Sequence, residues 1–248
     1  MLSEEGFRMY LFRKAILIIH GFAGGTYDEE SLLFELQHDI EFDVYNFTLP
    51  GHSTNLSNNI EYTDWINSVN DKIEKLISYG YKKIYVIGHS MGGLLATEAA
   101  IKYKEVKKLV LVAPAFSYLS LTDDSTISKA IKYGPEIIKE YKSKEVFSRF
   151  LKVSLEQLKE FEKLVSLSNS NPEKINIPTL IIHGLDDKLV PPESSENIYA
   201  AMKCPKWLLE LDGVTHDVFY SEKVDIINKE ISNFLKSNKY SAENIRKW

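Results

Sequence analysis

Short apolar runs that alternate with helical segments place the strongest constraint on the fold of this chain. Six runs rich in β-branched and apolar residues predict strands at residues 15–19, 44–47, 84–87, 109–112, 179–182 and 208–211. Most of these runs are apolar throughout, which is typical of strands that helices cover on both faces. Strands of this kind, separated by helices, predict an α/β fold with a mostly parallel sheet and right-handed crossovers.

Helical periodicity and capping signals fill the gaps between the predicted strands. The predicted helices span residues 27–38, 62–79, 91–103, 193–202 and 222–235. Thr26 and Glu29 have the spacing of a capping box for the first of them, and Gly80 is placed to end the second. Helices therefore follow strands along most of the chain.

Residues 115–176 break this alternation because they contain no convincing strand. Their apolar residues recur at helical spacing, and Pro114 and Pro178 lie close to the two ends of the region. We therefore expect a core formed by residues 1–114 and 177–248, with 115–176 inserted as a small helical cap. Four apolar cap residues are candidate substrate contacts: Phe147, Phe150, Leu151 and Phe161. The alternative for each is that it packs the cap onto the body.

Composition excludes several classes of function. A net charge of −5 over 248 residues argues against a nucleic-acid partner, which would require a concentrated surplus of Lys and Arg. Cys204 is the only cysteine, so the chain forms no internal disulfide and no thiolate metal cluster. The N-terminal residues are too charged for a signal peptide, and no apolar run is long enough to span a membrane. We expect a cytoplasmic protein without stable membrane insertion.

The segment IYVIGHSMGGLLATEAA, residues 84–100, carries the strongest chemical signal. Gly88, Ser90 and Gly92 form a Gly-x-Ser-x-Gly motif between a buried strand and a helix. A serine on so tight a turn requires neighbours without side chains, because a larger residue would collide with the strand or the helix. The turn also places Ser90 at a helix N-terminus, where the amide of Met91 is free to donate a hydrogen bond. Ser90 is therefore the candidate nucleophile.

A serine nucleophile requires a base, and for this geometry the order along the chain is serine, acid, histidine. Four of the six histidines, His20, His38, His52 and His89, precede Ser90. His183 does not fit this order, because it ends a predicted strand and no strand end that carries an acid lies between it and Ser90. His216 remains, in a loop between the last predicted strand and the last predicted helix.

The acid that orients His216 is expected after the strand at residues 179–182. Asp186 and Asp187 are adjacent there, and at least one of them is a turn former. Their spacing alone does not choose between the two carboxylates.

These motifs together resemble the α/β-hydrolase superfamily, with closest similarity to small bacterial carboxylesterases and monoacylglycerol lipases. The resemblance covers nearly the whole chain and includes LIIHGFAGG, LPGHSTN, GYKKIYVIGHSMGG and LIIHGLDDKLVPPESSENIY. Register against the family pattern Gly-x-x-Asp-x-x-Val-Pro implies Asp187 as the acid. The resemblance also implies that the backbone amides of Phe22 and Met91 form the oxyanion hole. Only about 14 residues precede the first predicted strand, which is too few for the two N-terminal strands that larger members of this family carry. We therefore expect a sheet of six or seven strands.

The resemblance implies a serine hydrolase that cleaves carboxylic esters through an acyl-enzyme, without a metal or cofactor. The apolar cap favours an ester with a hydrophobic acyl chain, such as a monoacylglycerol. The same fold and triad also serve thioesterases, acyltransferases, C–C hydrolases and proline aminopeptidases. A non-catalytic binding protein is the alternative from another class, and it predicts a broken triad. The apolar stripes of the cap could also support a homodimer.

Overall fold

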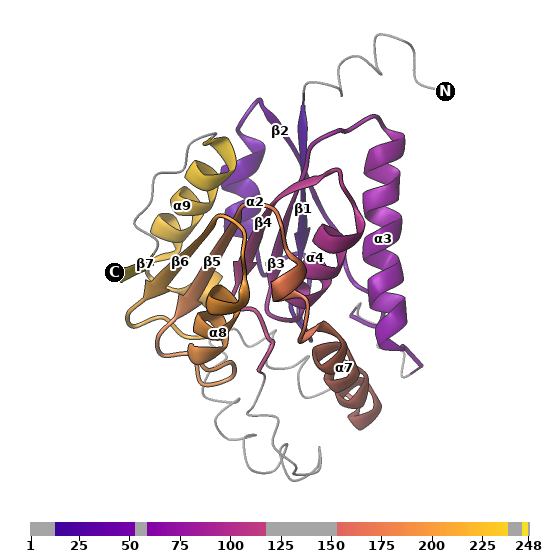
Figure 1. Ribbon diagram of the computed structural model, residues 1–248, viewed down its shortest axis with the longest axis vertical. Coiled ribbons are helices and arrows are strands. Elements are labelled where there is room, and N and C mark those ends of the chain that lie inside the picture. Colours follow the sequence, from indigo (N-terminus) through magenta and orange to yellow (C-terminus); the bar gives the residue numbers. More distant parts are fainter. Residues whose placement is uncertain (1–12, 53–58, 118–152, 238–244, 248) are drawn as a thin grey trace.

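The computed structural model describes residues 13–52, 59–117, 153–237 and 245–247. Seven parallel strands form one sheet in the order β2-β1-β3-β4-β5-β6-β7 (Figure 1). The strands are β1 (Lys14–Ile19), β2 (Phe42–Asn46), β3 (Ile84–His89), β4 (Val106–Val112), β5 (Thr179–Gly184), β6 (Lys206–Leu211) and β7 (Ile245–Lys247). The predicted parallel sheet is confirmed, and only the short edge strand β7 is without a counterpart in the sequence prediction.

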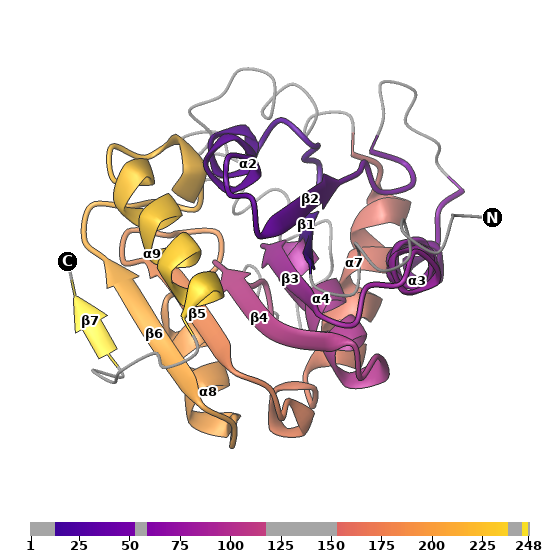
Figure 2. The ribbon, with the colours of Figure 1, turned by 90° about the horizontal axis from the view of Figure 1, so that it is seen from above.

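Helices cover both faces of the sheet, which explains why the central strands are apolar at successive positions. Helices α2 (Glu30–Gln37) and α9 (Val224–Lys236) lie together on one face (Figure 2). The other face carries α3 (Tyr62–Ser78), α4 (Met91–Lys102) and α8 (Glu193–Ala201). Within the described ranges, none of the helices is long and apolar enough to cross a membrane.

Successive residues of one strand belong to two separate parts of the core. In β1, Leu17 packs with the residues of α3 and α4, whereas Ile16 and Ile18 pack with those of α2 and α9. All three side chains are almost completely buried. The alternation follows from the strand period of two residues.

Two of the expected helix boundaries can be compared with their predicted capping signals, and one of them shifts. The helix predicted from residue 27 begins at Glu30, and its N-cap residue Glu29 accepts no side-chain capping hydrogen bond. The Thr26–Glu29 capping box is therefore wrong, because the Glu29 side chain is buried beside His89 instead. The second helix ends as expected before Gly80, which has a positive φ of 101°.

Part of the expected cap lies within the described residues. Helix α7 (Leu155–Ser168) begins with a capping box formed by Ser154 and Gln157, and the short 3-10 helix η1 (Pro172–Lys174) follows it. Helix α7 packs against α3 and α4 at one side of the sheet (Figure 1). The division of the chain into a core and a cap at residues 115–176 stays a prediction, because residues 118–152 lie outside the described ranges.

Candidate active site

Ser90 lies on a strained turn between β3 and α4. Its φ of 52° and ψ of −118° are unfavourable for a residue with a side chain, so the surrounding packing must enforce them. The two motif glycines show how. A Cβ atom on Gly88 would overlap with the backbone of Gly92, and one on Gly92 would overlap with the carbonyl oxygen of Ile19. The glycine spacing is therefore a steric requirement of the turn.

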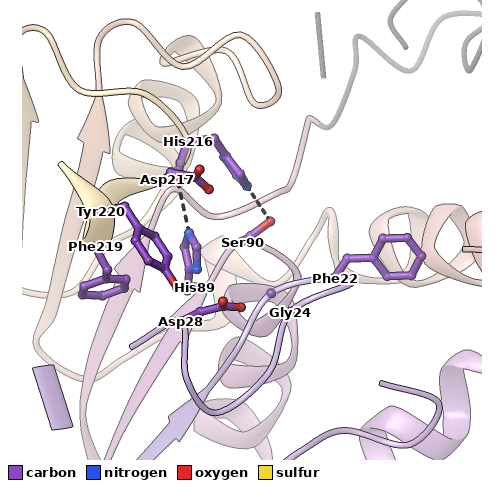
Figure 3. A pocket seen from close by; sticks show the side chains of 10 residues that line it. Phe22, Gly24, Asp28, His89, Ser90, His216, Asp217, Phe219 and Tyr220 are labelled. Carbon is purple, nitrogen blue, oxygen red and sulfur yellow. Dashed lines mark hydrogen bonds between the residues drawn. The ribbon is translucent and has the colours of Figure 1, made fainter. Parts of the chain in front are cut away.

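The structure brings Ser90, His216 and Asp187 into one hydrogen-bonded chain. His216 Nε2 lies 3.0 Å from Ser90 Oγ, and His216 Nδ1 lies 2.7 Å from Asp187 Oδ2. All three residues are at most 4% exposed. Figure 3 shows the imidazole of His216 directed at the serine hydroxyl. With Nδ1 donating to the carboxylate, Nε2 is left to accept the proton of the hydroxyl.

Three strand ends supply these side chains. Ser90 follows β3, Asp187 follows β5, and His216 lies in the loop after β6, just before the 3-10 helix η2 (Val218–Tyr220). The last two loops touch, because a Cβ atom on Gly184 would overlap with the carbonyl of Val214. Glycine at the end of β5 thus lets the His216 loop approach Asp187.

Asp187 is held by four hydrogen-bond donors. The amides of Leu189 and Val190 donate to Oδ1 over 2.9 and 2.8 Å, and His183 Nε2 and His216 Nδ1 approach Oδ2 to 3.1 and 2.7 Å. The N–H of His183 Nε2 is shared with the carbonyl oxygen of Val190, which lies 2.9 Å away. Burial alone would raise the pKa of Asp187, but attraction from His216 and the hydrogen bonds from both histidines hold it well below its usual range. The carboxyl is therefore ionised at neutral pH.

Asp186 has a different environment from its neighbour. Its side chain is exposed, whereas Asp187 is 4% exposed. The adjacent carboxylates that sequence spacing could not separate are thus distinguished by burial and by contact with His216.

The early His-Gly loop lies against the serine. A Cβ atom on Gly21 would come within 3.1 Å of Ser90 Cβ, so the backbone leading to Phe22 passes beside the candidate nucleophile. Met91 is the first residue of α4, and its amide has no acceptor within the helix. His20 fixes this loop, since Nδ1 bonds to the carbonyl of Gly21 and Nε2 accepts from the Leu49 amide.

Of the four predicted substrate-contact residues, only Phe161 lies within the described ranges. Phe147, Phe150 and Leu151 lie outside them. Phe161, on α7, is 1% exposed and stacks on Phe22 with ring centroids 4.9 Å apart. The Phe22 ring points away from Ser90 in Figure 3.

His89, which sequence order excluded as the base, contacts the loop that carries His216. Its Nε2 lies 3.3 Å from the carbonyl oxygen of His216, and its Nδ1 lies 3.3 Å from Glu29 Oε1. Burial lowers the pKa of His89, but the Glu29 carboxylate outweighs this and raises it above its usual value. The sequence carried no signal for this pair, because the two residues are 60 positions apart and belong to different elements.

A small pocket opens beside Ser90 and His216. Its lining residues are Gly21, Phe22, Gly24, Asp28, His89, Ser90, His216, Asp217, Phe219 and Tyr220 (Figure 3). Among the described residues, no group of three or more His, Cys, Asp or Glu side chains is arranged to hold a metal ion. The polar side chains of the lining belong to Asp28, His89, Ser90, His216, Asp217 and Tyr220.

Comparison with known proteins identifies the family to which the chain belongs. A family model described as alpha/beta hydrolase fold matches residues 14–152, and one described as serine aminopeptidase matches residues 123–223. A Mycoplasma pneumoniae protein described as an esterase or lipase is 26% identical over 96% of both chains. A carboxylesterase of Bacillus subtilis is 22% identical over 90% of this chain and 92% of its own.

Solved structures show the same fold. A structure reported for metagenome-derived lipolytic enzymes superposes with a TM-score of 0.73 at 20% identity, covering 91% of this chain and 94% of the other. The monoacylglycerol lipase of Paleococcus ferrophilus gives a TM-score of 0.70 at 21% identity, covering 89% and 93%. The chain belongs to the α/β-hydrolase family.

Proposed function

We propose that this protein is a serine hydrolase of carboxylic esters, with Ser90 as nucleophile, His216 as general base and Asp187 as its orienting acid. The observation that carries the proposal is the pair of hydrogen bonds, 3.0 and 2.7 Å long, that joins the three side chains. The non-catalytic alternative predicts a broken triad. The names of the relatives, esterase, lipase and carboxylesterase, support the ester as substrate class.

Acylation begins when Ser90 Oγ attacks the ester carbonyl. His216 Nε2 takes the hydroxyl proton, and the ionised Asp187 stabilises the imidazolium that forms. We assign the amides of Phe22 and Met91 to the oxyanion that develops on the substrate. This assignment is supported by the loop of Gly21, which lies against Ser90, and by the position of Met91 at the start of α4. His216 then protonates the leaving alcohol.

Deacylation repeats these steps with water in place of the alcohol. The sequence of events needs no metal or cofactor, since the nucleophile, base and oxyanion donors all belong to the chain.

We further propose an ester with an apolar acyl chain, of the kind that a monoacylglycerol carries. Support comes from a thermostable monoacylglycerol lipase of a Bacillus species, 24% identical over 74% of both chains, and from the apolar residues of the expected cap. Phe161 would act through the Phe22 ring that it stacks on. A cap formed by residues 115–176, the substrate contacts of Phe147, Phe150 and Leu151, a homodimer and a cytoplasmic location stay predictions from the sequence.

A hydrolysis series tests this proposal. Wild-type protein is assayed with p-nitrophenyl esters from acetate to decanoate, with a matched acyl thioester, and with amino-acid p-nitroanilides. We expect turnover of the esters with an optimum beyond acetate, and little turnover of the anilides. Absence of preference beyond acetate would contradict the lipid-like substrate, and faster cleavage of a prolyl anilide would favour the aminopeptidase alternative.

A further inference from the structure

The pocket beside Ser90 has the size of a water molecule. Its cavity measures about 20 Å³, which exceeds the roughly 10–15 Å³ that a single water requires. Both Ser90 and His216 belong to its lining, so a molecule inside it lies next to the nucleophile and the base together. A cavity this small has no room for an acyl chain.

Asp28 gives the pocket a polar wall. Its Oδ2 accepts a hydrogen bond from the Gly25 amide over 2.9 Å, whereas Oδ1, although buried, has no hydrogen-bond partner among the described residues. The residue is 8% exposed and lines the pocket. Figure 3 shows it on the side opposite Asp217, below His89. A buried carboxyl oxygen without a partner is costly, and a water molecule in the pocket would supply one.

The close approach of the backbone at Gly24 to the Asp28 side chain requires a residue without a side chain. A Cβ atom on Gly24 would overlap with Asp28 Oδ2, and the same atom would come within 3.0 Å of the Gly21 carbonyl. The turn that carries the expected oxyanion donor Phe22 therefore also brings Asp28 to the pocket beside Ser90.

We propose that this pocket holds the water that hydrolyses the acyl-enzyme, and that Asp28 positions it. The inference rests on the proposed function, because it concerns the second half of the same reaction. Water held against Asp28 competes with any alcohol that reaches the acyl-enzyme, so the pocket directs the acyl group to hydrolysis and away from transfer.

The step balances within the residues of the site. The water oxygen forms a bond to the acyl carbon while one of its protons passes to His216 Nε2. The resulting tetrahedral intermediate collapses by breaking the bond between the acyl carbon and Ser90 Oγ, and His216 returns the proton to that oxygen. The products are the free carboxylic acid and the regenerated serine hydroxyl.

A partition experiment tests the role of Asp28. The enzyme is acylated with p-nitrophenyl butyrate in buffer containing a fixed concentration of methanol, and the ratio of methyl ester to free acid is measured. This ratio depends only on the fate of the acyl-enzyme, so it is insensitive to the folded fraction and to the acylation rate. We expect Asp28→Ala and Asp28→Leu to raise the ratio by at least about fivefold, the loss expected for one hydrogen bond. Asp28→Asn keeps a polar group and should stay within about twofold of wild type.

Asp225→Ala is the control, because Asp225 is an exposed carboxylate on α9 that does not line the pocket. It should leave the ratio unchanged. The proposal is overturned if the ratio of Asp28→Ala equals that of wild type, or if Asp28→Asn changes it as much as Asp28→Ala does. Failure of the proposed function is a separate result, since wild-type protein would then release no p-nitrophenol beyond the Ser90→Ala background.

Discussion

His183 lies 3.1 Å from the carboxylate of Asp187, on the same oxygen that His216 approaches to 2.7 Å. The other ring nitrogen of His183 is 2.6 Å from the hydroxyl of Ser195, and His183 is fully buried. A second histidine therefore fixes the acid of the proposed triad from behind. Because it touches neither Ser90 nor the expected substrate, we class His183 as a positioning residue.

Replacing His183 should lower activity through its contact with Asp187. In His183→Gln we expect kcat to fall about 5- to 50-fold with KM nearly unchanged, the effect of one weakened hydrogen bond to a charged group. Steady-state kinetics on a p-nitrophenyl ester measures the two constants. A purely structural role would instead reduce the concentration of active sites at constant kcat, which titration with a fluorophosphonate distinguishes. Ser195→Ala, which removes the partner of the distal ring nitrogen, should show a smaller effect of the same kind.

The two adjacent aspartates should behave very differently. Asp187→Asn removes the charge that orients His216, and we expect kcat to fall by about 10³- to 10⁴-fold. Asp186→Asn is the matched control, because this side chain is exposed, and kcat should stay within about twofold of wild type. Equal losses in both variants would contradict the assignment of Asp187.

The turn at Ser90 should tolerate no side chain at Gly92. A Cβ atom there would overlap with the carbonyls of Ile19 and His20, so Gly92→Ala should destabilise the protein by about 4 kcal/mol or more. Gly213 offers a comparison, since it has a φ of 68° but no atom within 4 Å of a built Cβ. Gly213→Ala should cost only about 1 kcal/mol, the strain of the backbone alone. Urea unfolding measures the free energy of unfolding of both variants, and similar losses of stability in the two would contradict the steric explanation.

Asp28 should make stability depend on pH. Burial, followed by repulsion from Glu29, raises the pKa of Asp28 from 3.8 to about 7, whereas His89 opposes the rise and Asp217 adds to it. The folded state then binds the proton more tightly than the unfolded state, so this contribution to the free energy of unfolding is lost as pH rises through about 7.

Asp28→Asn removes that titration. The variant should gain stability relative to wild type as pH increases from about 5 to about 8, by up to roughly 3 kcal/mol. Urea unfolding of both proteins at the two pH values measures the difference. Asp225→Asn, at an exposed position, should show a difference that does not change with pH. A constant difference for Asp28→Asn would contradict the raised pKa.

The fold could be predicted from the sequence because each strand has a local apolar pattern. Ile16 and Leu17 are both apolar since helices cover both faces of the sheet, and this pattern is readable without coordinates. The turn at Ser90 could also be predicted, because the Gly-x-Ser-x-Gly motif is local, although the structure adds that Gly92 is required by the backbone of Ile19 and His20.

The tertiary contacts of individual polar side chains could not be predicted from local sequence patterns. Thr26 and Glu29 have the spacing of a capping box. The Glu29 side chain, however, is buried against His89 at the end of β3. His183 was set aside because it could not be the base, although it contacts the acid that the base requires. Asp28 carried no motif at all, and only its position in the pocket gives it a role. Glu29 and His89 are 60 positions apart, and although His183 and Asp187 are only four residues apart, their contact depends on how the loop after β5 folds back.

The most direct test of the central claim is covalent labelling of Ser90. Wild-type protein treated with a fluorophosphonate should gain the mass of one adduct per chain, and peptide mapping should locate it on Ser90. Ser90→Ala and His216→Ala should remain unlabelled while keeping the thermal unfolding transition of wild type. A folded wild-type protein that takes up no label, or an adduct that persists in Ser90→Ala, would contradict the assignment of this chain as a serine hydrolase.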